Sequence, residues 1–153
     1  MAELKQRLRS DLTAAMKARD ELRASTLRMV LTSITNAEVA GSTARSLSDE
    51  EVVAVLASEA RRRREAAAAF ADAERLQLAE KERAEAAIIT DYLPAQLSAD
   101  EIRQLVAEAI AATTSTGAGM KAMGTVMGAL RSRIKGRADG GVVAAEVRRQ
   151  LTG

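Results

Sequence analysis

The sequence predicts an all-α protein with two parts, an N-terminal antiparallel helical domain (residues 1–95) and a small three-helix C-terminal domain (residues 96–153). Hydrophobic residues make up 47% of the 153-residue chain, yet Phe70 and Tyr92 are its only aromatic residues, so the core must be aliphatic. The composition is rich in Ala, Leu, Glu and Arg and includes a single proline, which favours helices. Runs of β-branched and aromatic residues are too few to predict a sheet.

Four helices are predicted in the N-terminal part. The first carries Leu4, Leu8 and Leu12 at the i, i+4, i+8 spacing of one helix face. The third begins at a capping box, in which Ser48 accepts from the amide of Glu51 and the Glu51 side chain reaches back. Short connections between the helices favour an antiparallel arrangement. The predicted helices cover residues 2–17, 21–40, 49–70 and 76–93.

Pro94 marks the boundary between the two parts, because proline disfavours helical geometry at the preceding residue and cannot donate a backbone hydrogen bond. A second capping box, formed by Ser98 and Glu101, opens the first helix of the C-terminal part. A part this small is only marginally stable alone, so we expect it to pack on the N-terminal part or on a partner.

Two further helices complete the C-terminal part. A predicted loop over residues 113–119 leads into a helix over residues 120–135. Gly136 ends that helix, since glycine is the usual residue just past a helix C-terminus. Asp139 is the predicted N-cap of the last helix, which begins at Gly140.

The segment over residues 119–139 is the strongest candidate site in the chain, because it holds five cations and no acid before Asp139. Residues 98–153 contain eight basic and five acidic residues (net +3), whereas residues 1–97 contain 15 and 16 (net −1). This concentration of positive charge predicts a phosphate-rich partner. An equally open interpretation is a basic helix end that complements the helix dipole. The five cations are Lys121, Arg131, Arg133, Lys135 and Arg137.

The absence of cysteine and histidine excludes several kinds of site. It removes disulfides, thiolate nucleophiles, Ser-His triads and the usual zinc ligands. No glycine-rich phosphate loop is present either, so we predict neither catalytic residues nor a cofactor. The N-terminus is charged from Glu3 onward, and no apolar run approaches the ~18–20 residues of a membrane span. We therefore expect a cytoplasmic location.

Two other patterns have plain structural interpretations. Gly124 and Gly128 have a G-x-x-x-G spacing, which predicts close helix packing here more than membrane dimerisation. The methionines around them are interpreted as core fillers, with an adaptable protein-binding groove as the alternative. The run of residues 61–64 is all arginine, but successive helix positions point about 100° apart, so the four cannot share one face. Pairing of Glu59 with Arg63 predicts a salt-bridged helix surface instead.

Four ordered stretches of the chain resemble the GatB/YqeY family, specifically its stand-alone YqeY-like members. They are LRMVLTSITNAEV (27–39), SDEEVVAVL (48–56) with Glu59 and Arg63, YLPAQLSADEI (92–102), and MGTVMGAL followed by IKGRADG (123–140). The chain departs from the family at Glu74, where glycine or asparagine is common, so that turn is either rebuilt or stays helical. It also has Ala122, Thr125 and Ser132 where the family often has Asp, Lys and Pro. Arg133, Lys135 and Arg137 match basic positions of the family, whereas Lys121 and Arg131 do not.

The resemblance implies RNA handling more than catalysis. The same tail occurs in the B subunit of the tRNA-dependent amidotransferase, where it is implicated in holding the tRNA body while the chemistry belongs to other domains. The implied partner is therefore tRNA or another structured RNA, read by shape and phosphate charge because no aromatic side chain is interleaved with the cations. The alternatives are an adaptor for a protein of aminoacyl-tRNA metabolism and an accessory of a glutamine-dependent carbon–nitrogen ligase. No membrane association is expected.

Overall fold

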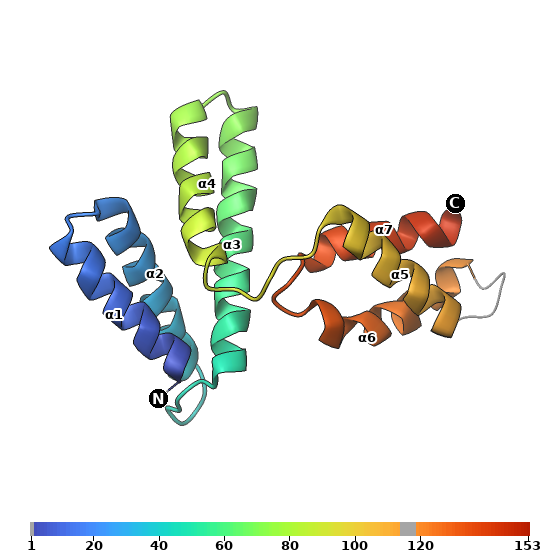
Figure 1. Cartoon of the computed structure of the whole chain (residues 1–153), viewed down its shortest axis with the longest axis horizontal. Coiled ribbons are helices and arrows are strands. Elements are labelled where there is room, and N and C mark those ends of the chain that lie inside the picture. Colours follow the sequence, from blue (N-terminus) through green and yellow to red (C-terminus); the bar gives the residue numbers. More distant parts are fainter. Residues whose placement is uncertain (1, 114–118) are drawn as a thin grey trace. The chain divides into compact units, whose positions relative to one another are not determined.

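The computed structural model describes residues 2–113 and 119–153 (Figure 1). Within these ranges the chain forms seven α-helices, one 3-10 helix and no β-strand, which confirms the all-α prediction. The helices are α1 (Glu3–Lys17), α2 (Glu21–Glu38), α3 (Asp49–Asp72), α4 (Leu76–Thr90), α5 (Ala99–Thr113), η1 (Gly119–Ala122, 3-10), α6 (Met123–Ile134) and α7 (Gly140–Thr152). None of the helices in the described ranges has the length and apolar character needed to cross a bilayer.

The chain divides into two compact units, Met1–Leu93 and Pro94–Gly153. The division lies next to Pro94, and the predicted organisation into two domains, residues 1–95 and 96–153, stays a prediction. Of the predicted loop over residues 113–119, residues 114–118 lie outside the described part of the chain. Thr113 is the last residue of α5, and Gly119 is the first residue of η1.

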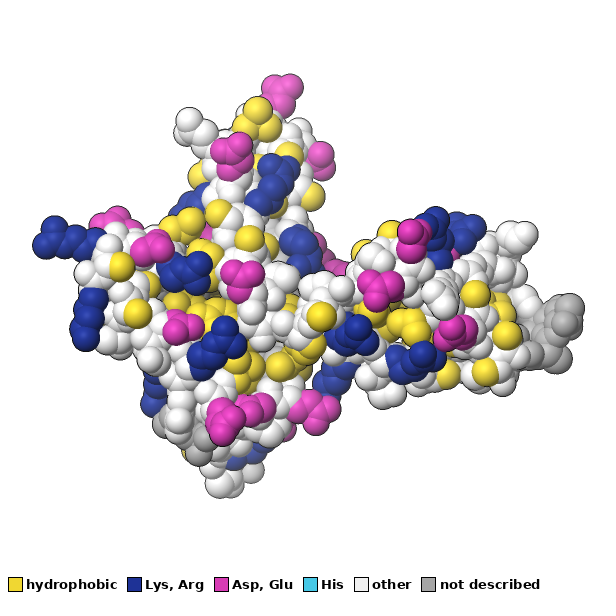
Figure 2. Space-filling model, viewed as in Figure 1, with side chains coloured by type: hydrophobic (Ala, Val, Ile, Leu, Met, Phe, Trp, Pro, Cys, Tyr) yellow, Lys and Arg dark blue, Asp and Glu magenta, His cyan; other side chains and the backbone are white. Residues whose placement is uncertain are grey.

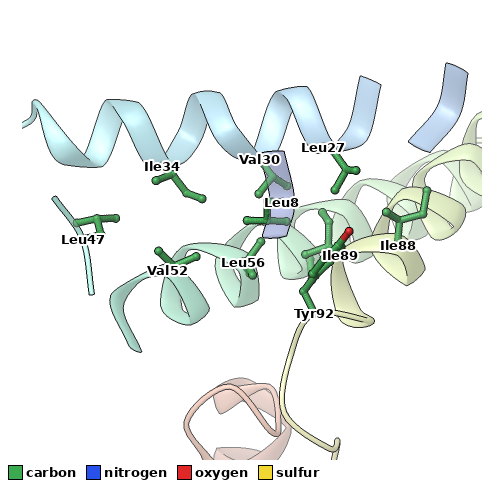
Figure 3. Packing of buried hydrophobic residues seen from close by; sticks show 11 residues of the cluster. Leu8, Leu27, Val30, Ile34, Leu47, Val52, Leu56, Ile88, Ile89 and Tyr92 are labelled. Carbon is green, nitrogen blue, oxygen red and sulfur yellow. The ribbon is translucent and has the colours of Figure 1, made fainter. Parts of the chain in front are cut away.

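The N-terminal unit consists of two helical hairpins, α1–α2 and α3–α4, around an aliphatic core. α3 and α4 pack along each other, and α2 contacts both of them. Leu8 of α1 points between Val30 of α2 and Leu56 of α3 (Figure 3). All three side chains are fully buried, so the core sits where the two hairpins meet.

Two turns of the N-terminal unit place non-glycine residues in the left-handed region. Arg19 has φ 58° between α1 and α2, and Glu74 has φ 60° between α3 and α4. In the second turn the amide of Arg75 donates to the Phe70 carbonyl at 2.8 Å, which closes the end of α3. The turn at Glu74 therefore breaks the helix, although a side chain there costs roughly 1–2 kcal/mol relative to right-handed geometry.

Both predicted capping boxes are present. The Ser48 hydroxyl accepts from the Glu51 amide at 3.2 Å, and the Glu51 carboxylate accepts from the Ser48 amide at 2.9 Å. Ser98 and Glu101 make the same pair of bonds at 3.1 and 3.0 Å. Because each box depends only on residues three apart, local sequence is sufficient to specify it.

The C-terminal unit packs α5 against α6 and α7 around a second aliphatic core. Its fully buried side chains are Val106, Val126, Leu130, Val143 and Val147. The helix predicted over residues 120–135 begins as the 3-10 turn η1 and becomes α-helical at Met123. Gly136, at φ 73°, follows its end, and the Asp139 carboxylate accepts from the Gly141 amide at 2.7 Å to cap α7 at Gly140.

Candidate nucleic-acid interface

The five predicted RNA-contacting cations lie along and just beyond α6. This helix buries Val126, Leu130 and Ile134, and that apolar stripe fixes the direction in which its other residues face. Four of the five cations are exposed, and the fifth is half-buried. They are Lys121 in η1, Arg131 and Arg133 in the last turn of α6, Lys135 at its C-cap, and the half-buried Arg137 after Gly136.

The cations do not form one cluster. Arg131 and Arg133 are two positions apart on the helix, so their side chains leave it about 200° apart, on opposite flanks of the buried stripe. Both also lie in the last turn, where a positive charge complements the helix dipole. Basic and acidic side chains are interspersed on the face of the molecule drawn in Figure 2, without a broad field of one sign.

Arg133 and Arg137 line the same shallow cavity, of about 270 Å³, with Glu101 and Glu108 of α5. The Arg133 Nη2 atom lies 3.5 Å from Oε2 of Glu108, and both side chains are about half exposed. Hydrogen bonds from the Ser98 amide and hydroxyl lower the pKa of Glu101, and the charge of Arg137 acts in the same direction. Two acids thus offset two cations here, and the cavity has no net charge.

Arg137 also has a structural task in the C-terminal unit. Its Nε donates to the Ala95 carbonyl at 3.1 Å, and its own carbonyl accepts from the Leu97 amide at 2.8 Å. Gln96 adds a bond to the Gly136 carbonyl at 2.8 Å. These contacts fasten the segment that begins at Pro94 to the connection between α6 and α7.

Lys121 and Arg131 lie near one open face of α6. Gly124, Gly128 and Arg131 follow i, i+4, i+7 spacing, and Lys121 precedes the first of them by three residues. A Cβ at either glycine would meet no atom within 4 Å beyond the helix's own backbone. No carboxylate of the described residues forms an ion pair with Lys121 or Arg131. The face therefore combines two uncompensated cations with an accessible backbone between them.

The open space at Gly124 and Gly128 corrects one prediction. Their G-x-x-x-G spacing predicts close helix packing, but among the described residues no second helix approaches either glycine. The physical reason is the position of the stripe formed by Val126 and Leu130, which turns the glycines away from the core. Met123 and Met127 do pack partly buried against that core, as core fillers, whereas the methionine at position 120 is 44% exposed.

The arginine run of α3 is salt-bridged, as predicted. Arg61 Nε lies 3.0 Å from Oε1 of Glu65, and Arg63 Nη2 lies 3.8 Å from Oε2 of Glu59. Arg62 also reaches Glu59, at 3.3 Å. Each of these pairs spans three or four residues of one helix, which is why the sequence could indicate them.

Sequence reasoning missed the carboxylates that meet the arginines across helices. Glu108 faces Arg133 from α5, and Glu82 and Glu85 face Arg63 from α4. Which acid meets which arginine depends on how two helices pack, and the spacing of residues within one helix does not reveal it.

The comparisons with known proteins agree with the resemblance seen in the sequence. A family model described as Yqey-like protein matches residues 5–151. No curated protein gives a significant match to the chain. Because the family model spans nearly all of the 153 residues, the chain belongs to the YqeY-like protein family.

Proposed function

We propose that this protein is a non-catalytic module that binds structured RNA, such as tRNA, through phosphate contacts on α6 and its flanking turns. The observation that carries the proposal is the pair Lys121 and Arg131, which are exposed and form no ion pair with any described carboxylate. Ten residues separate them, or about 15 Å along a helix, so they can contact different phosphates of one strand.

The remaining three cations have graded roles in this proposal. Arg133 is half exposed and can exchange Glu108 for a phosphate, since an exposed pair of this kind contributes at most about 1 kcal/mol. Lys135, at the exposed C-cap of α6, extends the same surface. Arg137 is held by the Ala95 carbonyl and serves mainly to order the segment around it.

The proposal predicts a salt-dependent affinity. Three to five phosphate contacts imply a slope of log K against log salt of roughly −2 to −4.5. A fluorescence titration with bulk tRNA over a series of salt concentrations measures it. A flat response would contradict binding through phosphates, whatever the site.

A matched pair of triple variants locates the site. Lys121→Gln, Arg131→Gln and Arg133→Gln should weaken tRNA binding and make the slope shallower by roughly 2 to 3. The control removes the same residue types from exposed positions of the N-terminal unit, by Lys17→Gln, Arg28→Gln and Arg83→Gln. Because both variants carry the same net charge, equal losses would indicate non-specific attraction and refute the assigned surface.

A protein-binding adaptor is the second candidate, favoured by the exposed Met120 beside the open glycine face of α6. Methionine side chains adapt to differently shaped apolar partners, and glycines permit a close approach. Pull-down with and without ribonuclease separates the two functions. Retention of a protein after ribonuclease treatment, with no tRNA affinity in the titration, would favour the adaptor.

A further inference from the structure

A group of ionised side chains lies inside the N-terminal unit, between α3 and α4. The guanidinium of Arg63 is surrounded by three carboxylates, those of Glu59, Glu82 and Glu85, at 3.8, 3.6 and 3.9 Å. The three acids are only 6, 18 and 10% exposed, and Arg63 is 23% exposed. One largely buried cation therefore faces three largely buried anions.

None of these contacts is short enough to be a hydrogen bond. Arg63 Nη1 contacts the sulfur of Met29 at 3.1 Å, and its Nε has no hydrogen-bond partner among the described residues. The Oε2 atom of Glu82 is also buried and has no hydrogen-bond partner among the described residues. Buried polar atoms without hydrogen-bond partners are rare in folded proteins. Their presence here means that hydrogen bonds do not fully compensate the buried charges of this group.

Glu59 is the best stabilised of the three acids. Its Oε1 accepts from the Ser33 hydroxyl of α2 at 2.9 Å and from Arg62 of α3 at 3.3 Å. Among the described residues, Glu85 forms ion pairs only with the distant Arg63 and, on its own helix, with Lys81, whose Nζ lies 3.9 Å from Oε1. The Lys81 side chain is 63% exposed, so water screens its charge.

Burial is the larger influence on Glu85. Removal from water raises its pKa above the ordinary value of 4.5, and the negative charge of Glu82 raises it further. Lys81 and Arg63 oppose this shift without cancelling it. From α2 the group is met by the uncharged Met29 and Ser33, which add no compensating charge.

We propose that Glu85 is a proton-binding residue of the folded N-terminal unit, through which the packing of α4 on α3 responds to pH. A proton on Glu85 removes one of the three buried negative charges and leaves a hydroxyl that can donate a hydrogen bond. The contribution of protonated Glu85 to the free energy of unfolding is complete below pH 4.5, where Glu85 is also protonated in the unfolded chain. This contribution is lost as the pH rises through the pKa of Glu85 in the folded state. Glu85 thus contributes more to the stability of the hairpin α3–α4 in weak acid than at neutral pH.

The test compares the whole protein with a Glu85→Gln variant, in which a neutral amide replaces the protonated carboxyl. Urea unfolding is followed between pH 4 and 8 by the fluorescence of Tyr92, the only tyrosine, which is buried in this unit. The unfolding constant of the native protein, divided by that of the variant, should rise with pH. Glu80→Gln, at an exposed position of α4, is the control and should leave this ratio independent of pH.

A direct measurement keeps the proposal testable even if the variant folds poorly. Carbon-detected NMR of the Glu85 side-chain carboxyl in the native protein should give a titration midpoint above 4.5. A midpoint at or below that value, or a ratio of unfolding constants that is flat or falls with pH, would overturn the proposal. Either result would mean that Arg63 and Lys81 outweigh burial.

Discussion

The two units place their charged groups differently. The buried polar side chains of the described residues, Lys5, Thr26, Glu59 and Glu85, all belong to the N-terminal unit. Lys5 and Glu38 form an ion pair at 2.6 Å with both side chains nearly inaccessible, and the hydrogen bond from Lys5 lowers the pKa of Glu38. The described buried side chains of the C-terminal unit are apolar.

This difference indicates separate uses of charge. In the N-terminal unit, buried ion pairs join side chains of different helices. Removing these charges from water costs free energy, and the pairs favour specific helix contacts. In the C-terminal unit the net charge of +3 comes from side chains that lie mostly on the surface, where a partner can reach them. The first unit is expected to respond to pH through its interior, and the second to salt through its surface.

The largest expected effect comes from truncating the C-terminal core. Leu130 is fully buried, and Leu130→Ala should cost about 2–5 kcal/mol, enough to unfold a unit with so small a core. Far-UV circular dichroism should lose helical signal while Tyr92 fluorescence, which reports the N-terminal unit, stays native. Simultaneous loss of both signals would show instead that the two units unfold as one cooperative body.

The matching change in the N-terminal unit removes one polar contact. The Tyr92 hydroxyl donates to the Asp11 carboxylate at 2.5 Å, and Tyr92→Phe should destabilise the protein by about 1–2 kcal/mol at pH 7. Burial, together with this hydrogen bond, raises the pKa of Tyr92 to about 12. The contribution is therefore present below pH 10 and is lost between pH 10 and 12, because the unfolded tyrosine ionises first.

Urea unfolding followed by circular dichroism at pH 7 and at pH 11.5 checks this prediction. The stability difference between the native protein and Tyr92→Phe should shrink at the higher pH. The guanidinium carbon of Arg7 lies 4.7 Å from the centroid of the Tyr92 ring, and it can lie equally over a phenylalanine ring. The contribution of this cation–π contact to stability therefore cancels in the comparison. A difference that grows at high pH would contradict the assigned role of the hydroxyl.

Local features of the fold could be predicted from the sequence. The capping boxes at Ser48 and Ser98 and the stop at Gly136 follow from residues that lie within a few positions of each other. Glu74 shows the limit of such reasoning, because local rules left both a rebuilt turn and a continuous helix open. The packing of α4 back along α3 decides between them, and it forces Glu74 into the left-handed region.

The candidate site was predictable only as a stretch of cations. Which of them have partners depends on the approach of α5 to α6, which places Glu108 beside Arg133 and leaves Arg131 on the opposite flank. The same limit applies to Arg63, because two of its three acidic neighbours, Glu82 and Glu85, come from another helix. The helical spacing of Val126, Leu130 and Ile134 is sufficient to predict that Gly124 faces away from the core, whereas the G-x-x-x-G spacing alone predicts the opposite.

The smallest predicted effect concerns those exposed glycines of the C-terminal unit. Glycine inside a helix costs roughly 0.5–1 kcal/mol relative to alanine, and a Cβ at Gly124 or Gly128 meets open space. Gly124→Ala and Gly128→Ala should therefore each stabilise the unit by about that amount in urea unfolding. Gly136→Ala is the contrasting control, because its φ of 73° makes any side chain unfavourable there.

The same variants also test whether the open face of α6 has a use. A surface that only exposes backbone to water gains stability from both alanines and loses nothing. If the sugar–phosphate backbone of an RNA lies against this face, the added methyl groups hold it away from the helix, and the doubly substituted protein should be more stable yet bind tRNA less tightly. Increased stability with unchanged tRNA affinity would confine the RNA contact to the long side chains of Lys121 and Arg131, which can reach a phosphate from a greater distance.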